Sequence, residues 1–218
     1  MLNLPFLAVY AVAEGLAAAA LLKTLRVKRS AAGVSYQTLL AFAIGHLGSF
    51  LFALVLPVSV STMAYAGASL LSALCLGLLI RVAFYHYCST YQAQVDSFGK
   101  RVLPSAISEM VVADLSPLKQ LSPNKQTQPP SEPVVRVHWL VLYVGTLAVA
   151  VSVECFRQHK QLGQTLSAMG SFSDCLLGLA LIPQLSMMLR SDKTHVARAV
   201  GTAVLYWTAA RAASFAFW

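Results

Sequence analysis

Long apolar runs alternate with short polar or charged segments along this chain. A helix rises 1.5 Å per residue, so about 20 apolar residues cross a hydrocarbon core that is about 30 Å thick. The predicted fold class is therefore all-α, a polytopic transmembrane helix bundle. Six spans are predicted, at Pro5–Leu22, Tyr36–Leu56, Met63–Tyr85, Val137–Val153, Gln164–Leu189 and Ala197–Trp218.

The fifth apolar run contains a proline, in the segment Leu181-Ile182-Pro183-Gln184-Leu185. In water such a proline usually ends a helix, but in a membrane bundle neighbouring helices can satisfy the carbonyl that it leaves free. The sequence therefore predicts a kinked span, with Pro183 and Gln184 as its hinge. We expect Gln184 to bond either the carbonyl freed by Pro183 or the backbone of another span.

The polar segment between the third and fourth runs differs in composition from the rest of the chain. Leu115 to Pro133 contains five prolines together with serine, glutamine, threonine and lysine, a composition typical of disordered loops. An offset of about 160 residues also places Glu14 over Asp174, which suggests an internal repeat. We therefore divide the chain into a first three-span repeat (1–88), a largely disordered cytosolic loop (89–135), a linking span (136–160) and a truncated second repeat (161–218).

Composition and charge support the membrane interpretation. Hydrophobic residues make up 57% of the chain and charged residues only 11%, against about 25% charged in soluble domains. The net charge of +8 comes from basic clusters between the apolar runs, which the positive-inside rule explains better than nucleic-acid binding does. Because the segments after the first, third and fifth spans carry most of these charges, we expect an outer or lumenal N-terminus. The expected surroundings are a lipid bilayer, with no nucleic-acid partner.

No motif indicates catalysis or a bound cofactor. The four cysteines have no C-x-x-C spacing, and no H-E-x-x-H, G-x-S-x-G, phosphate-binding loop or paired-carboxylate pattern is present. The sequence therefore predicts neither an enzyme nor a metal or cofactor site.

Ionisable residues inside the predicted spans are the main candidates for a functional site, because charge at membrane depth is costly. They are Glu14, His46, Asp174 and Arg211. One interpretation is that Arg211 faces a lumenal cavity and binds a ligand carboxylate, with Asp174 as its resting partner. The alternatives are a buried structural ion pair, or an Arg211 side chain that extends to the membrane interface.

The other candidates also leave two interpretations open. Glu14 either belongs to the site or packs between helices. His46 either titrates near pH ~6.5 and couples binding to acidity, or is simply hydrogen-bonded within the bundle. Tyr206, Trp207 and Trp218 either line the cavity or anchor the ends of their span at the membrane interface.

Several motifs, in order along the chain, resemble the KDEL receptors (ER lumen protein-retaining receptors), which are PQ-loop membrane proteins. Arg29 to Ser35, RSAAGVS, is similar to that family's RSCAGIS, and Thr90-Tyr91 with Asp96-Ser97-Phe98 is similar to its TYD…DTF. Arg136-Val137 with Val144 to Leu147 resembles RVEFLVVPVGGL, and Leu181 to Leu185 resembles ILPQL. Arg211 and Trp218 repeat the family's spacing between an arginine and a tryptophan.

The resemblance implies a seven-span protein of the ER and Golgi membranes. Such a receptor would bind C-terminal K-D-E-L-like signals of lumenal proteins in the acidic Golgi, return them to the ER and release them at neutral pH. Vesicle coat proteins would be further partners. The alternatives are a SWEET-like PQ-loop carrier of a small solute, or a truncated homologue that binds no signal.

The chain also departs from this family pattern. About 37 residues, Gly99 to Val135, intervene before the fourth span, and the family's seventh helix and basic tail have no counterpart before Trp218. The family's second span carries an arginine that binds the signal's carboxylate, whereas here only His46 could take that place. The family's first-span histidine, tied to pH sensing, has no match, although Glu14 lies within one position of it.

Overall fold

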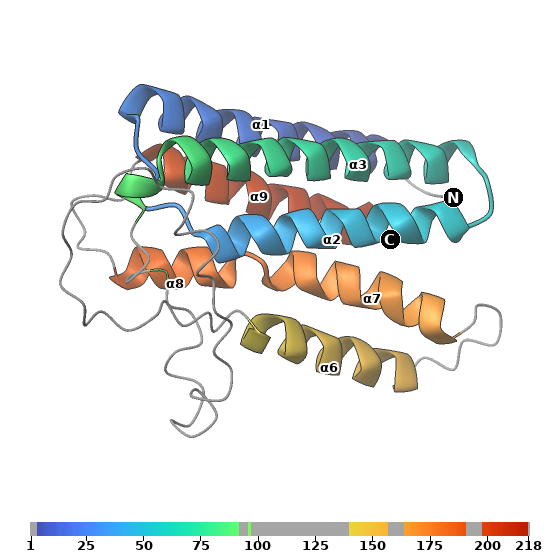
Figure 1. The fold of residues 1–218 in the computed structure, drawn as a ribbon. Helices are drawn as coiled ribbons and strands as arrows, with labels where there is room; N and C mark the ends of the chain where they lie inside the picture. The colour runs from blue at the N-terminus through green and yellow to red at the C-terminus, as the bar shows by residue number, and fades with distance from the viewer. Residues whose placement is uncertain (1–3, 92–95, 97–139, 157–163, 191–197, 218) are drawn as a thin grey trace, which may run out of the picture.

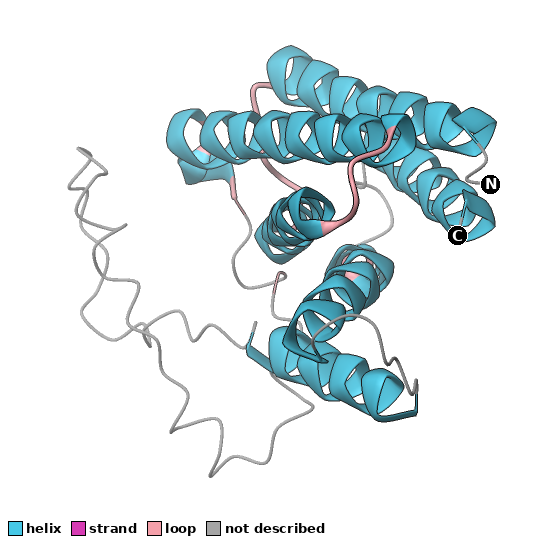
Figure 2. Cartoon of the chain, turned by 90° about the vertical axis from the view of Figure 1, so that its right-hand side faces the viewer, coloured by secondary structure: helices cyan, strands magenta, loops and turns pink. Residues whose placement is uncertain are grey.

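The computed structural model describes residues 4–91, 96, 140–156, 164–190 and 198–217. Within these ranges all the regular elements are helical, which confirms the predicted all-α class (Figures 1 and 2). The predicted loop 89–135 lies outside the described residues, apart from 89–91 and 96. The α-helices are α1 (Leu4–Lys28), α2 (Tyr36–Val55), α3 (Val60–Arg81), α6 (Leu140–Phe156), α7 (Gln164–Leu179), α8 (Ile182–Arg190) and α9 (Arg198–Phe217), and α3 is followed by a short π-helix, Val82–His86, and a 3-10 turn, Cys88–Thr90.

Each predicted apolar run coincides with helix, but not every helix can be called a span. Pro5–Lys28, Tyr36–Val55, Val60–His86 and Ala168–Leu189 are long and apolar enough to cross a membrane. Helix α6 has only 17 residues, and α9 carries Arg211 within its apolar stretch. Among the described residues, length and composition therefore support four crossings where six were predicted.

The helices form one bundle whose members run side by side (Figure 1). Helix α1 packs against α9 and α3, α2 packs against α3 and α7, and α6 packs against α7. The main core is apolar, and two of its largest buried side chains, Phe42 and Trp207, stack with ring centroids 4.9 Å apart. This packing brings α1, α2 and α9 together in the middle of the bundle.

Helix α2 approaches α7 closely because glycine occupies the contact. A Cβ atom added at Gly45 would lie 2.7 Å from the Leu177 side chain, and one at Gly48 would have even less room beside Ser173. A Cβ atom at Gly45 would therefore force the Leu177 side chain to move, and one at Gly48 would force the Ser173 hydroxyl to rotate away. The close contact holds the middle of α2, where His46 lies, inside the bundle.

The predicted kink at Pro183 is a break between two helices. Helix α7 ends at Leu179, Ala180 and Leu181 form a turn, and α8 begins at Ile182. The nitrogen of Pro183 carries no proton to donate to the carbonyl of Leu179, four residues earlier, so the helical hydrogen-bond pattern stops there. The kink is thus confirmed in position, while motion about this hinge stays a prediction.

Candidate functional site

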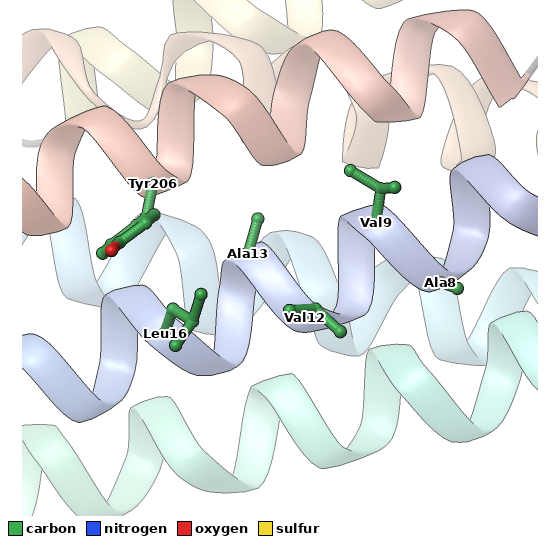
Figure 3. A pocket seen from close by; sticks show the side chains of 6 residues that line it. All are labelled: Ala8, Val9, Val12, Ala13, Leu16 and Tyr206. Carbon is green, nitrogen blue, oxygen red and sulfur yellow. The ribbon is translucent and has the colours of Figure 1, made fainter.

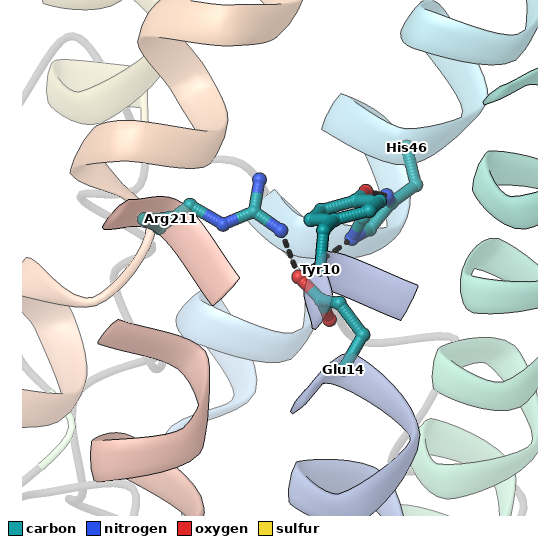
Figure 4. Close-up of polar contacts among 4 residues, drawn as sticks. All are labelled: Tyr10, Glu14, His46 and Arg211. Atoms are coloured by element: carbon teal, nitrogen blue, oxygen red, sulfur yellow. Dashed lines mark hydrogen bonds and ion pairs between the residues drawn. The ribbon is translucent and has the colours of Figure 1, made fainter. Parts of the chain in front are cut away.

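Four polar side chains from three helices meet inside the bundle (Figure 4). Tyr10 and Glu14 come from α1, where four residues place them on one helix face. His46 comes from α2 and Arg211 from α9. These four residues, here called the central cluster, are all buried, with 0% of His46 and 8% of Arg211 exposed.

Glu14 is the hub of the central cluster. Arg211 donates a hydrogen bond from Nη2 to Oε1 of Glu14, and Nε2 of His46 lies 3.4 Å from the same oxygen. The hydroxyl of Tyr10 is hydrogen-bonded to Nδ1 of His46 at 3.1 Å. The carboxylate therefore lies between a permanent cation and a group that becomes a cation on protonation.

Aromatic rings enclose the cation of this cluster. The guanidinium carbon of Arg211 lies 5.1 Å from the ring centroid of Tyr10 and 5.6 Å from that of Phe42, both within the range of cation–π attraction. Arg211 is thus enclosed by the bundle, which agrees with the interpretation of a buried ion pair and differs from the one in which Arg211 faces a lumenal cavity. Its Nε and the Nε2 of His46 have no hydrogen-bond partner within the described part of the chain. The cluster therefore keeps hydrogen-bonding capacity that its own residues do not use.

The structure gives Arg211 a different acid from the predicted Asp174. Helix α9 packs against α1, so the carboxylate that reaches Arg211 is that of Glu14. Asp174 on α7 has an exposed side chain, and its charge acts on Tyr65 of α3. Asp174 and Arg211 were considered as a pair because they lie at similar depths in the membrane on two antiparallel helices. The depth of a residue, however, does not tell which way its side chain points around its helix.

Two of the aromatic candidates, Tyr206 and Trp207, are described by the structure, and neither belongs to the central cluster itself. Tyr206 lines an apolar groove between α1 and α9, on the surface of the bundle (Figure 3). Trp207 is buried against Phe42, and Trp218 lies outside the described residues. Tyr10 was not predicted, although its spacing of four residues from Glu14 on a helix was a usable signal.

A second polar cluster joins the loop after α1 to α8. The side-chain oxygen of Gln184 accepts a hydrogen bond from the backbone N–H of Ser35 at 2.8 Å, and its Nε2 donates to the carbonyl of Gly33 at 2.8 Å. Gly33 has a φ of 82°, which favours glycine. Of the two roles predicted for Gln184, the structure shows the bond to another segment's backbone.

Asp96 completes this second cluster at the start of α2. Its carboxylate accepts hydrogen bonds from the hydroxyl of Ser35 at 2.8 Å, the N–H of Tyr36 at 2.7 Å and the hydroxyl of Tyr91 at 2.6 Å. A negative charge is favourable at a helix N-terminus. Nearby, Thr90 accepts a hydrogen bond from the backbone of Ala31. The motifs RSAAGVS, TY…D and PQ, far apart in the sequence, thus meet in what we call the loop cluster.

Protonation of Asp96 should make stability depend on pH. Burial raises the pKa of this carboxyl above the ordinary value of about 3.9, although its hydrogen bonds act in the opposite direction. The folded state therefore keeps the proton to a higher pH than the unfolded chain does. We expect the contribution of Asp96 to the free energy of unfolding to fall as pH rises from about 4 through the raised pKa. Unfolding measured across this range should show a weaker pH dependence in Asp96→Asn than in the wild type.

Comparison with known proteins identifies the family. The sequence model of the family described as ER lumen protein retaining receptor matches residues 30–218, which include His46, Asp96, Gln184 and Arg211. A search of curated proteins returned no match. The match covers most of the chain and, apart from Arg29, all three motifs of the loop cluster. The chain therefore belongs to the ER lumen protein retaining receptor family.

Proposed function

We propose that this receptor binds the C-terminal retention signals of lumenal proteins in the Golgi and returns them to the ER, with tighter binding at acidic pH. The observation that carries the proposal is the buried central cluster of Glu14, His46 and Arg211, in a chain of this receptor family. Its place of action would be the ER and Golgi membranes. Vesicle coat proteins would be its partners on the other side of the bilayer.

The ligand's chemistry matches the central cluster. A K-D-E-L-like signal ends in a free carboxylate, and a guanidinium can bind a carboxylate through two parallel hydrogen bonds. Arg211 already donates to the carboxylate of Glu14, and its Nε is unused. In our proposal the terminal carboxylate of the signal replaces Glu14 on Arg211.

In this proposal, protonation of His46 makes the affinity for the retention signal depend on pH. With neutral His46, the charges of Glu14 and Arg211 cancel, so an entering carboxylate would leave the buried cluster with a net negative charge. With His46 protonated, the cluster carries one positive charge, which the ligand neutralises. His46 lies 3.4 Å from Glu14 and can keep that carboxylate as a partner when Arg211 turns to the ligand. Binding and protonation are thus coupled, and affinity rises as pH falls.

Transport of a small solute is the alternative hypothesis. Glu14 lies near the middle of α1, and carriers built from repeats bind their substrates near the bilayer midplane. Helix α2 also contains no arginine, unlike the second span of signal-binding relatives that the sequence resembles. Proteoliposomes that take up a labelled sugar or amino acid, from protein that binds no signal peptide, would favour this alternative.

Peptide binding to the purified protein tests the proposal. We expect a labelled peptide ending in K-D-E-L to bind more tightly at pH ~5.5 than at pH ~7.4, and its C-terminal amide to bind at least tenfold more weakly. The double variant Glu14→Gln/Arg211→Gln keeps the cluster neutral and should lose binding by about 100-fold, as expected when a buried charged partner of a ligand is removed. Arg81→Gln, at an exposed arginine of α3, is the matched control.

Two results would contradict the proposal. The first is equal affinity for the acid and the amide at both pH values. The second is wild-type affinity in a folded Glu14→Gln/Arg211→Gln protein, which would assign the ion pair to structure alone.

A further inference from the structure

The hydroxyl of Tyr10 is hydrogen-bonded to His46, and this bond fixes which ring nitrogen carries the proton. Nε2 of His46 lies 3.4 Å from a carboxylate oxygen of Glu14, which can only accept, whereas Nδ1 lies 3.1 Å from the Tyr10 hydroxyl (Figure 4). In the neutral ring, Nε2 therefore keeps the proton and Nδ1 accepts from Tyr10. Each nitrogen of this completely buried ring then faces a suitable partner.

Protonation of His46 forces the bond to Tyr10 to reverse. The charged ring carries an N–H group at both nitrogens, so Nδ1 can no longer accept the proton of the hydroxyl. Instead Nδ1 donates to the oxygen of Tyr10, and the hydroxyl proton must turn to another acceptor. Only 2% of Tyr10 is exposed, so solvent at the surface of the bundle does not supply that acceptor. Since a buried donor without a partner is costly, an acceptor beside Tyr10 decides how readily His46 becomes charged.

The hydroxyl of Ser69, on α3, lies beside Tyr10 and can be that acceptor. Arg211 and Ser69 both place hydrogen-bonding groups next to the Tyr10 hydroxyl, but a guanidinium has no acceptor atom. Ser69 is completely buried, and its Oγ has no hydrogen-bond partner within the described part of the chain. A serine on a helix can donate its own proton to the carbonyl four residues earlier, so Ser69 can accept from Tyr10 while its own proton stays paired.

The titratable groups of the neighbouring helices are engaged with other partners. Glu14 of α1 and Arg211 of α9 form an ion pair with each other. Tyr65 of α3 lies beside Ser69 and within the field of Asp174, the acid on α7. Reversal of the hydrogen bond therefore depends on Ser69.

We propose that Tyr10 and Ser69 form a hydrogen-bond switch that lets His46 take up a proton. In the neutral state the Tyr10 hydroxyl donates to Nδ1 of His46. In the charged state a proton from solution is bonded to Nδ1, Nδ1 donates to the oxygen of Tyr10, and the Tyr10 hydroxyl donates to Oγ of Ser69. The inference rests on the proposed role of His46 as the titrating group, and it makes Tyr10 and Ser69 positioning residues for that role.

Nitrogen NMR of the purified protein with isotope-labelled histidine, in the absence of any peptide, tests the switch. The signals of His46 are those that disappear in His46→Gln. We expect the neutral ring at pH ~7.4 to carry its proton on Nε2, and the charged ring to become populated toward pH ~5.5. In Ser69→Ala the ratio of charged to neutral His46 at a given pH should fall about tenfold, because the Tyr10 hydroxyl then lacks its acceptor. The position of the proton in the neutral ring should not change.

Ser49→Ala is the matched control. Ser49 is a second buried serine whose Oγ has no partner among the described residues, and it lies beside Tyr65 rather than Tyr10. Its replacement should leave the ratio at the wild-type value. Tyr10→Phe should lower the ratio at least as much as Ser69→Ala does. Once Tyr10 is phenylalanine, Ser69→Ala should have no further effect, because the two residues act as a unit.

Three results would overturn the inference. They are an unchanged ratio in Ser69→Ala, an equal fall in Ser49→Ala, and a wild-type His46 that stays neutral down to pH ~5. Tyr10→Phe supplies the same comparison if Ser69→Ala does not fold, and an unchanged ratio there would count equally against the switch. Because the NMR signals are recorded without peptide, failure of the switch can be told apart from failure of signal binding.

Discussion

Replacement of Arg211 by glutamine is expected to destabilise the folded protein by about 3–5 kcal/mol. The change leaves the carboxylate of Glu14 buried without its cation, and breaking one side of a buried ion pair typically has a cost of this size. The aromatic contacts with Tyr10 and Phe42 are lost as well. The midpoint of thermal unfolding of the purified protein, followed by tryptophan fluorescence, should therefore fall markedly.

The double variant Glu14→Gln/Arg211→Gln separates buried charge from packing. It removes both charges and keeps two hydrogen-bonding amides, so most of the lost stability should return. A double variant that is less stable than Arg211→Gln alone would contradict the view that uncompensated charge dominates the effect. If neither change altered unfolding, the Arg211–Glu14 contact would contribute nothing measurable to the fold.

Asp96→Ala is expected to be the second severe change, with a loss of about 3 kcal/mol. Three donors, on Ser35, Tyr36 and Tyr91, would lose a charged acceptor, and Ser35 is completely buried. Hydrogen bonds to charged groups contribute about 1.5–3 kcal/mol each, although bonds within one network do not add fully. The same thermal measurement should show this loss.

Ser59→Ala provides a matched control for Asp96→Ala. The side chain of Ser59 caps the start of α3, as the loop cluster caps the start of α2. Unlike Asp96, however, Ser59 is exposed to solvent. An exposed cap of this kind is worth about 1 kcal/mol. If Asp96→Ala cost no more than Ser59→Ala, the loop cluster would be an ordinary helix cap that does not tie separate segments together.

The helices could be predicted well because each is encoded locally. The run Tyr36–Leu56 was predicted as a span and is helix at Tyr36–Val55, since apolar length and the polar segments at either end define its bounds. The break beside Pro183 was predictable for the same reason, because the missing donor lies within the chain itself. Six crossings were predicted, whereas four of the described helical stretches have the length and composition of a span, since α6 is short and α9 contains a charge.

The candidate site was predicted only in part. Ionisable residues within apolar runs are rare enough that Glu14, His46 and Arg211 could be selected without a structure. The contact of Arg211 with Glu14 was not predicted, because the sequence does not tell that α9 packs against α1. The loop cluster was also missed: its motifs indicated a family, but nothing in their spacing predicted that Asp96 and Gln184 bond the same residue, Ser35.

The apolar helical character of this protein, the positions of its helices and three of the four residues of the central cluster could be read from the amino-acid order alone. These properties follow from the composition and order of neighbouring residues, since the hydrophobic pattern and backbone hydrogen bonds act over a few turns of helix. The contact of Arg211 with Glu14, and the cluster formed by the motifs around Ser35, Asp96 and Gln184, became visible only in the folded chain. The physical reason is that the rotation of each helix about its axis, and its choice of neighbour, depend on how all the side chains pack together.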